Sequence, residues 1–344
     1  MLDLLSVPQQ RRESIERLAQ ELRAGRSVAI STHINADGDG CGSETALSRL
    51  LGQMGIRSRI VNPTPWPEMY RFLLGDDVRD ASELGAKALN ESDVLVVLDI
   101  SDVKRLGVLA EAVRRLKIPK LVIDHHLPSD EPPSALMVAD VTACATGELI
   151  YDFATCLGLE VTPDVARALY VALLTDTGGF RFSNTTARCL SIAGQLIASG
   201  VEPEEMYSRL YASMPVGRLH LLRDALATLE VDPEYGISWI SVAAGAAEEY
   251  GLKSEDLEGI AEHPRSIGGT RLALFFRDLG HDKVKVSFRS TGTVDVNKFA
   301  KQFGGGGHAK AAGALIEGSL DYVRHNVVQA AREFLRGEDK EGVA

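Results

Sequence analysis

The sequence has few cysteines, and their placement argues against a protein held together by disulfides. The four of them, at Cys41, Cys144, Cys156 and Cys189, form no C-x-x-C pair. A chain of 344 residues is also long enough to fold around a hydrophobic core without such links. We therefore expect reduced thiols.

Long apolar runs and an excess of positive charge are missing as well. No stretch approaches the ~18 apolar residues of a membrane-spanning helix, and residues 1–13 lack the pattern of a signal peptide. Proteins that coat long nucleic acid are rich in Lys and Arg, but here 37 such residues face 48 Asp and Glu, a net charge of −11. We expect a cytoplasmic protein without a membrane or a long nucleic acid as partner. A small anionic substrate stays compatible, provided that bound cations reverse the local field.

What the sequence does contain is typical of a soluble protein with two domains. Hydrophobic residues make up 45% and charged residues 25%, and 344 residues exceed the usual size of one core. Short apolar strands at 27–32, 94–98 and 120–123 alternate with helical patterns, which predicts an α/β fold with a parallel sheet. We expect a catalytic domain over 1–225, a smaller mixed α/β substrate domain over 226–338 and a tail over 339–344, with the active site in the cleft between the domains.

Polar residues gather where the predicted parallel strands end, the edge at which open α/β sheets bind ligands. Alone, each cluster could be a turn, a helix cap or surface polarity. Together, carboxylates and imidazoles gathered at one edge repel or desolvate one another unless cations compensate them, and such ligands without cysteine suit Mn²⁺ or Mg²⁺. The three clusters are His33 with Asp37 and Asp39, then Asp99 with Ser101, then Asp124 with His125 and His126.

Three further segments carry groups suited to phosphate chemistry. Asp176 ends a helical pattern and precedes a glycine-containing turn, which alone would indicate only the end of a helix. The run at 304–307 is either a flexible linker or a set of backbone N–H groups that can bind a phosphate, and its place after a predicted helix and before His308 favours the second interpretation. Arg289 offers a guanidinium that can bind a phosphate through two hydrogen bonds.

These motifs, in this order, resemble the DHH phosphoesterases. The C-terminal part resembles the associated domain found in the branch with the RecJ exonucleases and the NrnA-type nanoRNA hydrolases. The resemblance covers nearly the whole chain. It rests on His33-x-x-x-Asp37-x-Asp39, Asp99 with Ser101, Asp124-His125-His126, Asp176-Thr177-Gly178, and Ser287-Phe288-Arg289-Ser290 followed by four glycines and His308.

The resemblance implies a role for each motif residue. It implies that His33 and Asp37 bind one cation and that Asp39 and His125 bind a second. Asp99 and Asp176 would bridge the two cations or serve both. Two divalent ions about 4 Å apart need such shared carboxylates and can then activate a common water. His126 is expected near the leaving oxygen or a phosphate oxygen, and Asp124 behind the ligands as an orienting group. The catalytic set is thus His126, Asp99 and Asp176, and the substrate-binding set is Arg289, Ser290, Gly306, Gly307 and His308.

The implied activity is hydrolysis of short oligoribonucleotides to 5′-mononucleotides and of 3′-phosphoadenosine 5′-phosphate to AMP, with two divalent ions, Mn²⁺ preferred and Mg²⁺ as the alternative. Three alternatives stay open: a phosphodiesterase for linear or cyclic dinucleotides, a non-catalytic nucleotide sensor and, less favoured, an inorganic pyrophosphatase. The expected partners are short RNA or small nucleotides, and a homodimer is compatible with the sequence.

Overall fold

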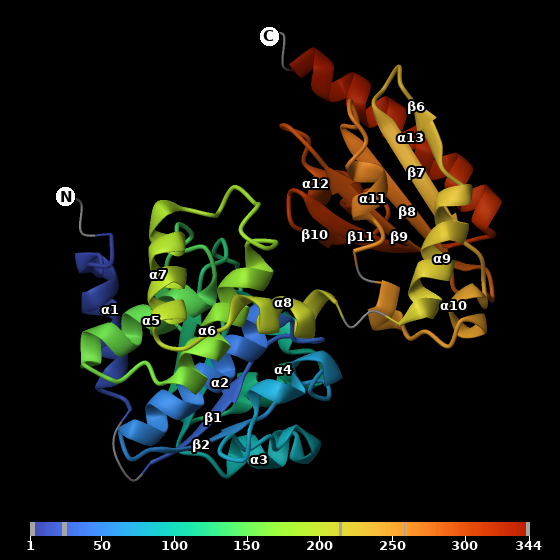
Figure 1. Cartoon of the computed structure of the whole chain (residues 1–344). Helices are drawn as coiled ribbons and strands as arrows, with labels where there is room; N and C mark the ends of the chain where they lie inside the picture. Colours follow the sequence, from blue (N-terminus) through green and yellow to red (C-terminus); the bar gives the residue numbers. More distant parts are fainter. Residues whose placement is uncertain (1–3, 23–25, 213–214, 258, 342–344) are drawn as a thin grey trace. The chain divides into compact units, whose positions relative to one another are not determined.

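The chain folds into two compact units, Met1–Ala212 and Ser213–Ala344, each described here by itself (Figure 1). The structure is a computed structural model that describes residues 4–22, 26–212, 215–257 and 259–341. Within these residues no helix is both long enough and apolar enough to cross a membrane.

The first unit alternates helices with five strands, all of them parallel, in the order β2-β1-β3-β4-β5. The short η segments are 3₁₀ helices. Its elements are α1 (Gln9–Ala19), β1 (Ser27–Ser31), α2 (Gly38–Gln53), β2 (Arg57–Ile60), η1 (Glu68–Leu73), η2 (Ser82–Leu84), α3 (Ala86–Asn90), β3 (Val94–Leu98), η3 (Val103–Leu109), α4 (Ala110–Arg115), β4 (Lys120–Asp124), β5 (Met137–Ala139), α5 (Thr146–Leu157), α6 (Pro163–Asp176), α7 (Ala187–Ala198) and α8 (Pro203–Tyr211).

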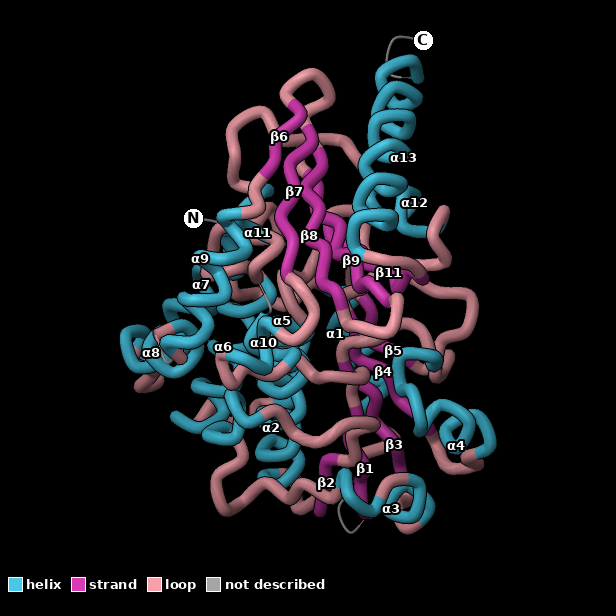
Figure 2. The backbone as a smooth tube through the Cα atoms, turned by 90° about the vertical axis from the view of Figure 1, so that its right-hand side faces the viewer, coloured by secondary structure: helices cyan, strands magenta, loops and turns pink. Residues whose placement is uncertain are grey.

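Both faces of this sheet are covered, which explains why its strands are continuously apolar. Alternate residues of β3 point to opposite sides: Val94 and Val96 pack with α2, α5 and α6, whereas Leu95 and Val97 pack toward α3 and α4. Figure 2 shows α2 and α6 on one side of β1, β3 and β4, and α4 on the other. Because β1, β3 and β4 are parallel, their carboxyl ends lie at the same edge of the sheet, where the predicted clusters lie.

The second unit is built on a six-stranded sheet with the order β10-β11-β9-β8-β7-β6. Among the described strands of this unit, β7 and β8 pair in parallel, and the other pairs are antiparallel. Its elements are α9 (Val216–Ala227), β6 (Glu230–Asp232), β7 (Ile237–Val242), α10 (Ala246–Glu249), η4 (Ser254–Leu257), α11 (Glu262–Arg265), β8 (Leu272–Asp278), β9 (Lys283–Ser290), α12 (Val296–Lys301), β10 (Gly306–Gly307), β11 (Ala311–Glu317) and α13 (Leu320–Glu341).

The α/β fold class with a parallel sheet and a second, mixed unit is confirmed, but the boundaries differ from the predicted ones. The units divide between Ala212 and Ser213 rather than near residue 225, because α9 packs on β7 of the second unit through Leu221 and Ala225. The predicted tail from residue 339 begins instead as helix, since α13 continues to Glu341. The remaining tail residues, 342–344, lie outside the described part of the chain.

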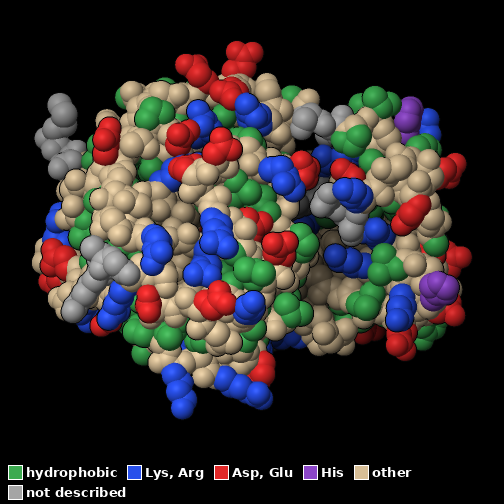
Figure 3. Space-filling view, turned by 90° about the horizontal axis from the view of Figure 1, so that it is seen from below, with side chains coloured by type: hydrophobic (Ala, Val, Ile, Leu, Met, Phe, Trp, Pro, Cys, Tyr) green, Lys and Arg blue, Asp and Glu red, His purple; other side chains and the backbone are tan. Residues whose placement is uncertain are grey.

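Acidic and basic side chains are interspersed on the face drawn in Figure 3. Many of the surface arginines form ion pairs with neighbouring carboxylates, as Arg114 does with Glu131 at 2.6 Å and Arg209 with Glu205 at 2.8 Å. Such pairing neutralises the positive charge locally, so these arginines do not form a continuous positive surface for a polyanion.

Candidate metal centre

The first cluster lies in the turn between β1 and α2, and one of its aspartates begins the helix. Asp37 is the N-cap of α2, and its Oδ1 accepts the N–H groups of Asp39 at 3.1 Å and Gly40 at 3.0 Å. This cap starts α2 at Gly38, directly after Asp37. A Cβ on Gly38 would lie 2.4 Å from Oγ1 of Thr175 in α6, so glycine lets the two helices approach closely.

The second cluster consists of Asp99, which follows β3 directly in an unusual backbone conformation. Its φ is 62°, in the left-handed region that non-glycine residues seldom adopt. Such conformations persist where the surrounding structure enforces them, and they concentrate at functional sites. The side chain is almost fully buried at 2% exposure, and its two oxygens face different histidines.

One group of ligand atoms forms around His33. Its Nε2 lies 3.4 Å from Oδ2 of Asp99 and 3.6 Å from Oδ2 of Asp37. Its Nδ1 lies 2.9 Å from the carbonyl oxygen of Ile34, which can only accept, so in the neutral imidazole Nδ1 carries the proton and Nε2 presents a lone pair. This Nε2 is buried and has no hydrogen-bond partner.

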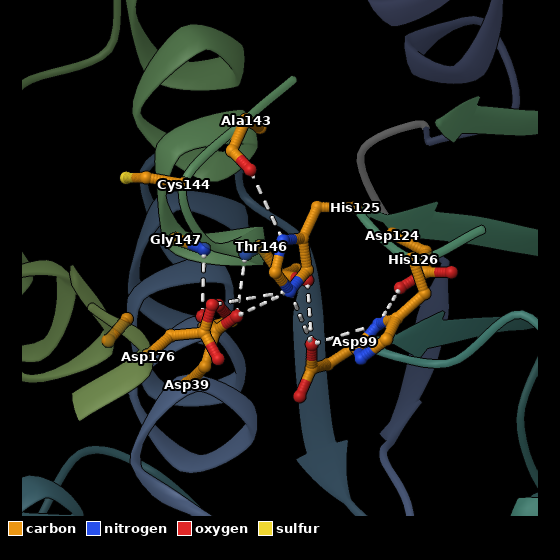
Figure 4. A network of polar contacts seen from close by, with 12 residues as sticks. Asp39, Asp99, Asp124, His125, His126, Ala143, Cys144, Thr146, Gly147 and Asp176 are labelled. Atoms are coloured by element: carbon orange, nitrogen blue, oxygen red, sulfur yellow. Dashed lines mark hydrogen bonds and ion pairs between the residues drawn. The ribbon is translucent and has the colours of Figure 1, made fainter. Parts of the chain in front are cut away.

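A second group forms around His125, and Figure 4 shows it from close by. The imidazole Nε2 lies 3.7 Å from Oδ2 of Asp39, 3.6 Å from Oδ2 of Asp176 and 3.6 Å from Oδ1 of Asp99. Nδ1 lies 3.2 Å from the carbonyl oxygen of Ala143, which fixes the same tautomer as in His33. This Nε2 is also buried without a hydrogen-bond partner.

This arrangement fits a metal centre better than a hydrogen-bonded network. Two buried imidazole lone pairs face carboxylate oxygens at 3.4 to 3.7 Å, a separation that donor atoms keep when each lies about 2.1 Å from a shared cation. The atoms within reach of one another form three sets of possible ligands: His33 with Asp37 and Asp99, Asp39 with His125 and Asp176, and Asp99 with His125 and His126. All six residues predicted as ligands are thus brought together.

Without a cation these groups perturb one another strongly. Burial and the charges of Asp99 and Asp176 raise the pKa of Asp39 well above its ordinary value, and burial with the charges of Asp99 and Asp37 raises the pKa of Asp176 to about 6. Burial lowers the pKa of His33, but the carboxylates of Asp37 and Asp99 outweigh it and raise that pKa to about 10. Protons therefore compete with cations for this site.

The predicted catalytic histidine is held by the predicted orienting aspartate. Nδ1 of His126 lies 2.7 Å from Oδ1 of Asp124 and 3.7 Å from Oδ1 of Asp99. Although burial lowers the pKa of His126, Asp124 and Asp99 outweigh it, so the net shift is upward. Asp124 thus orients His126, whereas His125 is oriented by the Ala143 carbonyl.

Several groups at the site escaped the sequence analysis. Asp39 accepts the backbone N–H groups of Thr146 at 2.6 Å and Gly147 at 2.9 Å, and Asp176 accepts from Nδ2 of Asn184 at 3.2 Å. Asn184 belongs to the polar segment that follows Asp176 and could have been considered. Thr146 and Gly147 gave no signal, because the start of a helix does not reveal a distant partner.

The predicted substrate-binding residues of the second unit lie on β9, β10 and the turn after it. Nε of Arg289 donates to Oε1 of Glu262 at 2.8 Å, and Oε2 of Glu262 pairs with Arg265 at 2.6 Å. One carboxylate therefore holds two guanidinium groups. Ser290 is 1% exposed, and its hydroxyl donates to the Val294 carbonyl at 2.7 Å.

The glycine run is an ordered edge of the second sheet. Gly306 and Gly307 form the exposed strand β10 against β11, and the N–H of Gly307 donates to Oδ1 of Asn297 at 3.2 Å. A Cβ on Gly307 would lie 2.5 Å from the carbonyl oxygen of Ala311, so this position needs glycine for packing alone. The N–H of His308 donates to the same carbonyl at 2.7 Å.

Comparisons with known proteins agree with the order of the motifs. The DHH family N-terminal domain matches residues 27–173, and the DHHA1 domain matches residues 237–337. The bifunctional oligoribonuclease and PAP phosphatase NrnA of Thermus thermophilus is 32% identical over 329 residues, which cover 94% of this chain and 95% of that protein.

Two solved structures share the fold. An exopolyphosphatase-related protein from Bacteroides fragilis has a TM-score of 0.88 at 24% identity, over 98% of this chain and 99% of that chain. RecJ of Thermus thermophilus in complex with Mn²⁺ has a TM-score of 0.55 at 16% identity, over 96% of this chain and 55% of that one. At these identities the likeness concerns the fold alone. The two matched domains and the relative at 32% identity show that the chain belongs to the DHH phosphoesterase superfamily, in the branch that carries the DHHA1 domain.

Proposed function

We propose that this protein is a phosphoesterase that uses two divalent cations to hydrolyse short oligoribonucleotides to 5′-mononucleotides and 3′-phosphoadenosine 5′-phosphate to AMP. The observation that carries the proposal is the pair of buried Nε2 atoms of His33 and His125, each facing carboxylate oxygens, with Asp99 common to both. The substrates follow from those of the Thermus relative, a bifunctional oligoribonuclease and PAP phosphatase that is similar along nearly its whole length.

Divalent cations, when bound in such a site, supply a hydroxide nucleophile near neutral pH and neutralise charge on the phosphate. The chain's own residues then have separate tasks. His33, Asp37, Asp39, His125 and the shared Asp99 and Asp176 form the ligand set. His126, held by Asp124 and with its pKa raised, is suited to donate a hydrogen bond to a phosphate oxygen or a proton to the leaving 3′-oxygen.

We further propose Mn²⁺ as the preferred cation, since ligands that combine carboxylates with imidazoles and contain no thiolate suit it. Mg²⁺ prefers oxygen ligands and gives up its water reluctantly, so two imidazoles among the ligands count against it. Titration of the metal-free protein with both ions tests this preference, which would be wrong if Mg²⁺ supported equal rates at equal concentration.

One experiment tests the function as a whole. Purified protein with Mn²⁺ is given di- to pentaribonucleotides, 3′-phosphoadenosine 5′-phosphate, linear and cyclic dinucleotides, pyrophosphate and long single-stranded DNA. We expect release of 5′-mononucleotides and AMP from the first two. Preference for cyclic dinucleotides would replace the proposed substrate, and binding of nucleotides without turnover would indicate a sensor.

Both proposed substrates share a scissile bond between phosphorus and a 3′-oxygen, so one geometry can serve both. We propose that the terminal 5′-phosphate is held by Arg289, His308 and the amides of Gly306 and Gly307, which gives 5′-to-3′ digestion. In this proposal the phosphate replaces Oδ1 of Asn297 as the acceptor of the Gly307 N–H. Glu262 supports the role of Arg289 because it fixes the direction of that guanidinium while its charge is offset by Arg265. Release of the label first from a trimer labelled at its 3′ end would contradict this polarity.

The 5′-phosphate site is tested by Arg289→Ala. Loss of a charge-assisted contact should weaken 5′-phosphorylated substrates by roughly 2 kcal/mol, with a much smaller effect on an unphosphorylated analogue. Lys285→Ala is the matched control, because Lys285 is an exposed cation on the same face of β9. Equal impairment of both substrates by Arg289→Ala would show that this residue does not recognise the phosphate.

A further inference from the structure

The start of α5 lies against the candidate metal centre and has no cap from its own segment. Ala145 is the N-cap residue and offers no side-chain hydrogen bond. The first N–H groups of a helix need acceptors, and Asp39 supplies them from another helix, through its Oδ2 to Thr146 and its Oδ1 to Gly147. The positive end of α5 thereby stabilises the charge on Asp39.

Thr146 makes a second contact with the centre through its side chain. Its hydroxyl lies 3.0 Å from Oδ1 of Asp99, and both residues are buried, at 0% and 2% exposure. The backbone N–H of Thr146 thus donates to Asp39, a member of the His125 group. Its hydroxyl donates to Asp99, which belongs to the sets of both His33 and His125. Figure 4 shows Thr146 beside the His125 ring, above Asp39.

The position of Thr146 is fixed from the side of α5 that faces away from these contacts. Glu148 is 1% exposed and accepts the N–H of Cys144 through Oε2 at 3.0 Å. Its Oε1 accepts from Arg11 at 2.6 Å and from Arg188 at 3.2 Å. The segment that enters α5 is therefore held in place by buried arginine–carboxylate pairs that do not depend on a bound metal ion.

We propose that Thr146 is a positioning residue of the metal centre: its hydroxyl orients Asp99 so that one carboxylate serves both groups of ligands. This inference rests on the proposed metal centre. The backbone conformation of Asp99, with φ of 62°, does not set the side-chain torsions that direct its carboxylate, and the Thr146 hydroxyl supplies a directional constraint on Oδ1. Oδ2 is then left to face His33 at 3.4 Å.

The test compares Thr146→Ser with Thr146→Ala, two variants that differ by one hydroxyl group. Mn²⁺ binding to each metal-free protein is measured by calorimetry, and the rate of dinucleotide hydrolysis is measured as a function of Mn²⁺. Removing a group that orients a metal ligand weakens metal affinity by about 10- to 100-fold. We expect that loss in Thr146→Ala, near wild-type affinity in Thr146→Ser, and an activity loss in Thr146→Ala that saturating Mn²⁺ reduces.

Two further variants separate positioning from stability. Thr146→Val keeps the volume and lacks the hydroxyl, so it should behave like Thr146→Ala. Thr155→Val makes the same change on the same helix at an exposed position where the hydroxyl donates to the Tyr151 carbonyl, and it should bind Mn²⁺ like the wild type. Equal Mn²⁺ affinity in Thr146→Ser and Thr146→Ala would overturn the proposal.

Failure of the proposed function would look different. If the wild-type protein binds no Mn²⁺, the metal centre itself is wrong, and the inference about Thr146 falls with it. If the wild-type protein binds Mn²⁺ but hydrolyses none of the nucleotides, the function is wrong, and the difference in Mn²⁺ affinity between Thr146→Ser and Thr146→Ala still decides the inference.

Discussion

The first unit contains two buried clusters of charge, both in contact with α5, and they are built differently. In the arginine cluster, Arg11 and Arg188 meet Glu148 and Asp152, with Asp140 at the edge. In the candidate metal centre, the aspartates form ion pairs with histidines and, among the described residues, with no arginine or lysine. Among the described residues, the arginine cluster contains no unpartnered buried side-chain atom, whereas the centre contains three, Nε2 of His33, Nε2 of His125 and Oδ2 of Asp124.

The contrast between the two clusters shows how a fold can indicate a cation site. A buried carboxylate is tolerated when a guanidinium forms hydrogen bonds to it, as Arg11 does to Glu148 at 2.6 Å and to Asp152 at 2.9 Å. The metal centre has the same kind of acids in the same unit without that compensation. We infer that the arginine cluster is complete by itself, whereas the centre requires charge from outside the chain.

The largest effect is expected from Asp99→Asn, which removes the shared charge from the centre. Asparagine tolerates the left-handed conformation of this position, so the fold should persist while turnover falls by about 10³-fold or more. Initial rates at saturating Mn²⁺ measure the effect. Asp102→Asn is the control, since Asp102 caps the next helical segment and asparagine caps equally well. Wild-type rates in Asp99→Asn would remove the basis of the comparison.

Arg11→Met should break the arginine cluster and leave the centre chemically intact. Removing one partner of a buried ion pair leaves uncompensated carboxylates, which costs about 3–5 kcal/mol in the free energy of unfolding. Urea unfolding of the full-length variant and of the full-length wild type measures this loss. Arg12→Met is the control, because Arg12 is half-buried on the same helix and forms no ion pair with the described residues. The two clusters would not be distinct if Mn²⁺ stabilised Arg11→Met by a different amount than it stabilises the wild type.

The strands and the clusters at their ends could be predicted from sequence, because buried parallel strands are continuous apolar runs and their carboxyl ends share one edge. Local patterns explain this success: β3 matches its predicted range of 94–98. The boundary between the units was placed too late, because the apolar face of α9 does not reveal which sheet it covers. The short strand β5 was missed, since three residues carry too little pattern.

The support of the centre could not be predicted, because it depends on pairs far apart in the chain. Thr146 and Asp39 are 107 positions apart, and an alanine at the N-cap of α5 gives no hint that a distant carboxylate serves as the cap. Glycines at the start of α2 also disguise that helix, since glycine is a poor helix former. A Cβ on Gly42 would lie 2.4 Å from the Ala168 carbonyl oxygen, so close packing with α6 requires glycine there.

Asp176→Asn should stabilise the metal-free protein and remove its activity. The pKa of Asp176 is raised from 3.8 to about 6, so the folded state binds this proton more tightly than the unfolded state. This contribution to stability is therefore lost as pH rises from about 4 through about 6. Asparagine cannot ionise, and its variant should lack that part of the loss. Each 1 kcal/mol recovered corresponds to about 2–4 °C in the Tm of a unit of this size.

Thermal unfolding of both proteins in chelator across this pH window measures the difference. In saturating Mn²⁺ the order should reverse, because the wild type gains more from cation binding. An Asp176→Asn protein that is less stable than the wild type at pH 7 in chelator would mean that the carboxylate is compensated within the chain, as in the arginine cluster.

The smallest effect is expected at the far end of α5, where Gly158→Ala should lower stability without touching the centre. Gly158 ends the helix with φ of 63°, and a Cβ there would meet no atom within 4 Å, so the cost of about 1 kcal/mol comes from the left-handed backbone alone. Gly52→Ala in α2 is the matched control: it has the same open surroundings and a helical backbone, so alanine should stabilise it by about 0.5–1 kcal/mol. Mn²⁺ affinity should stay unchanged in both. If Gly158→Ala weakened Mn²⁺ binding as much as Thr146→Ala, the metal centre would depend on the stability of α5 as a whole rather than on the hydroxyl at its start.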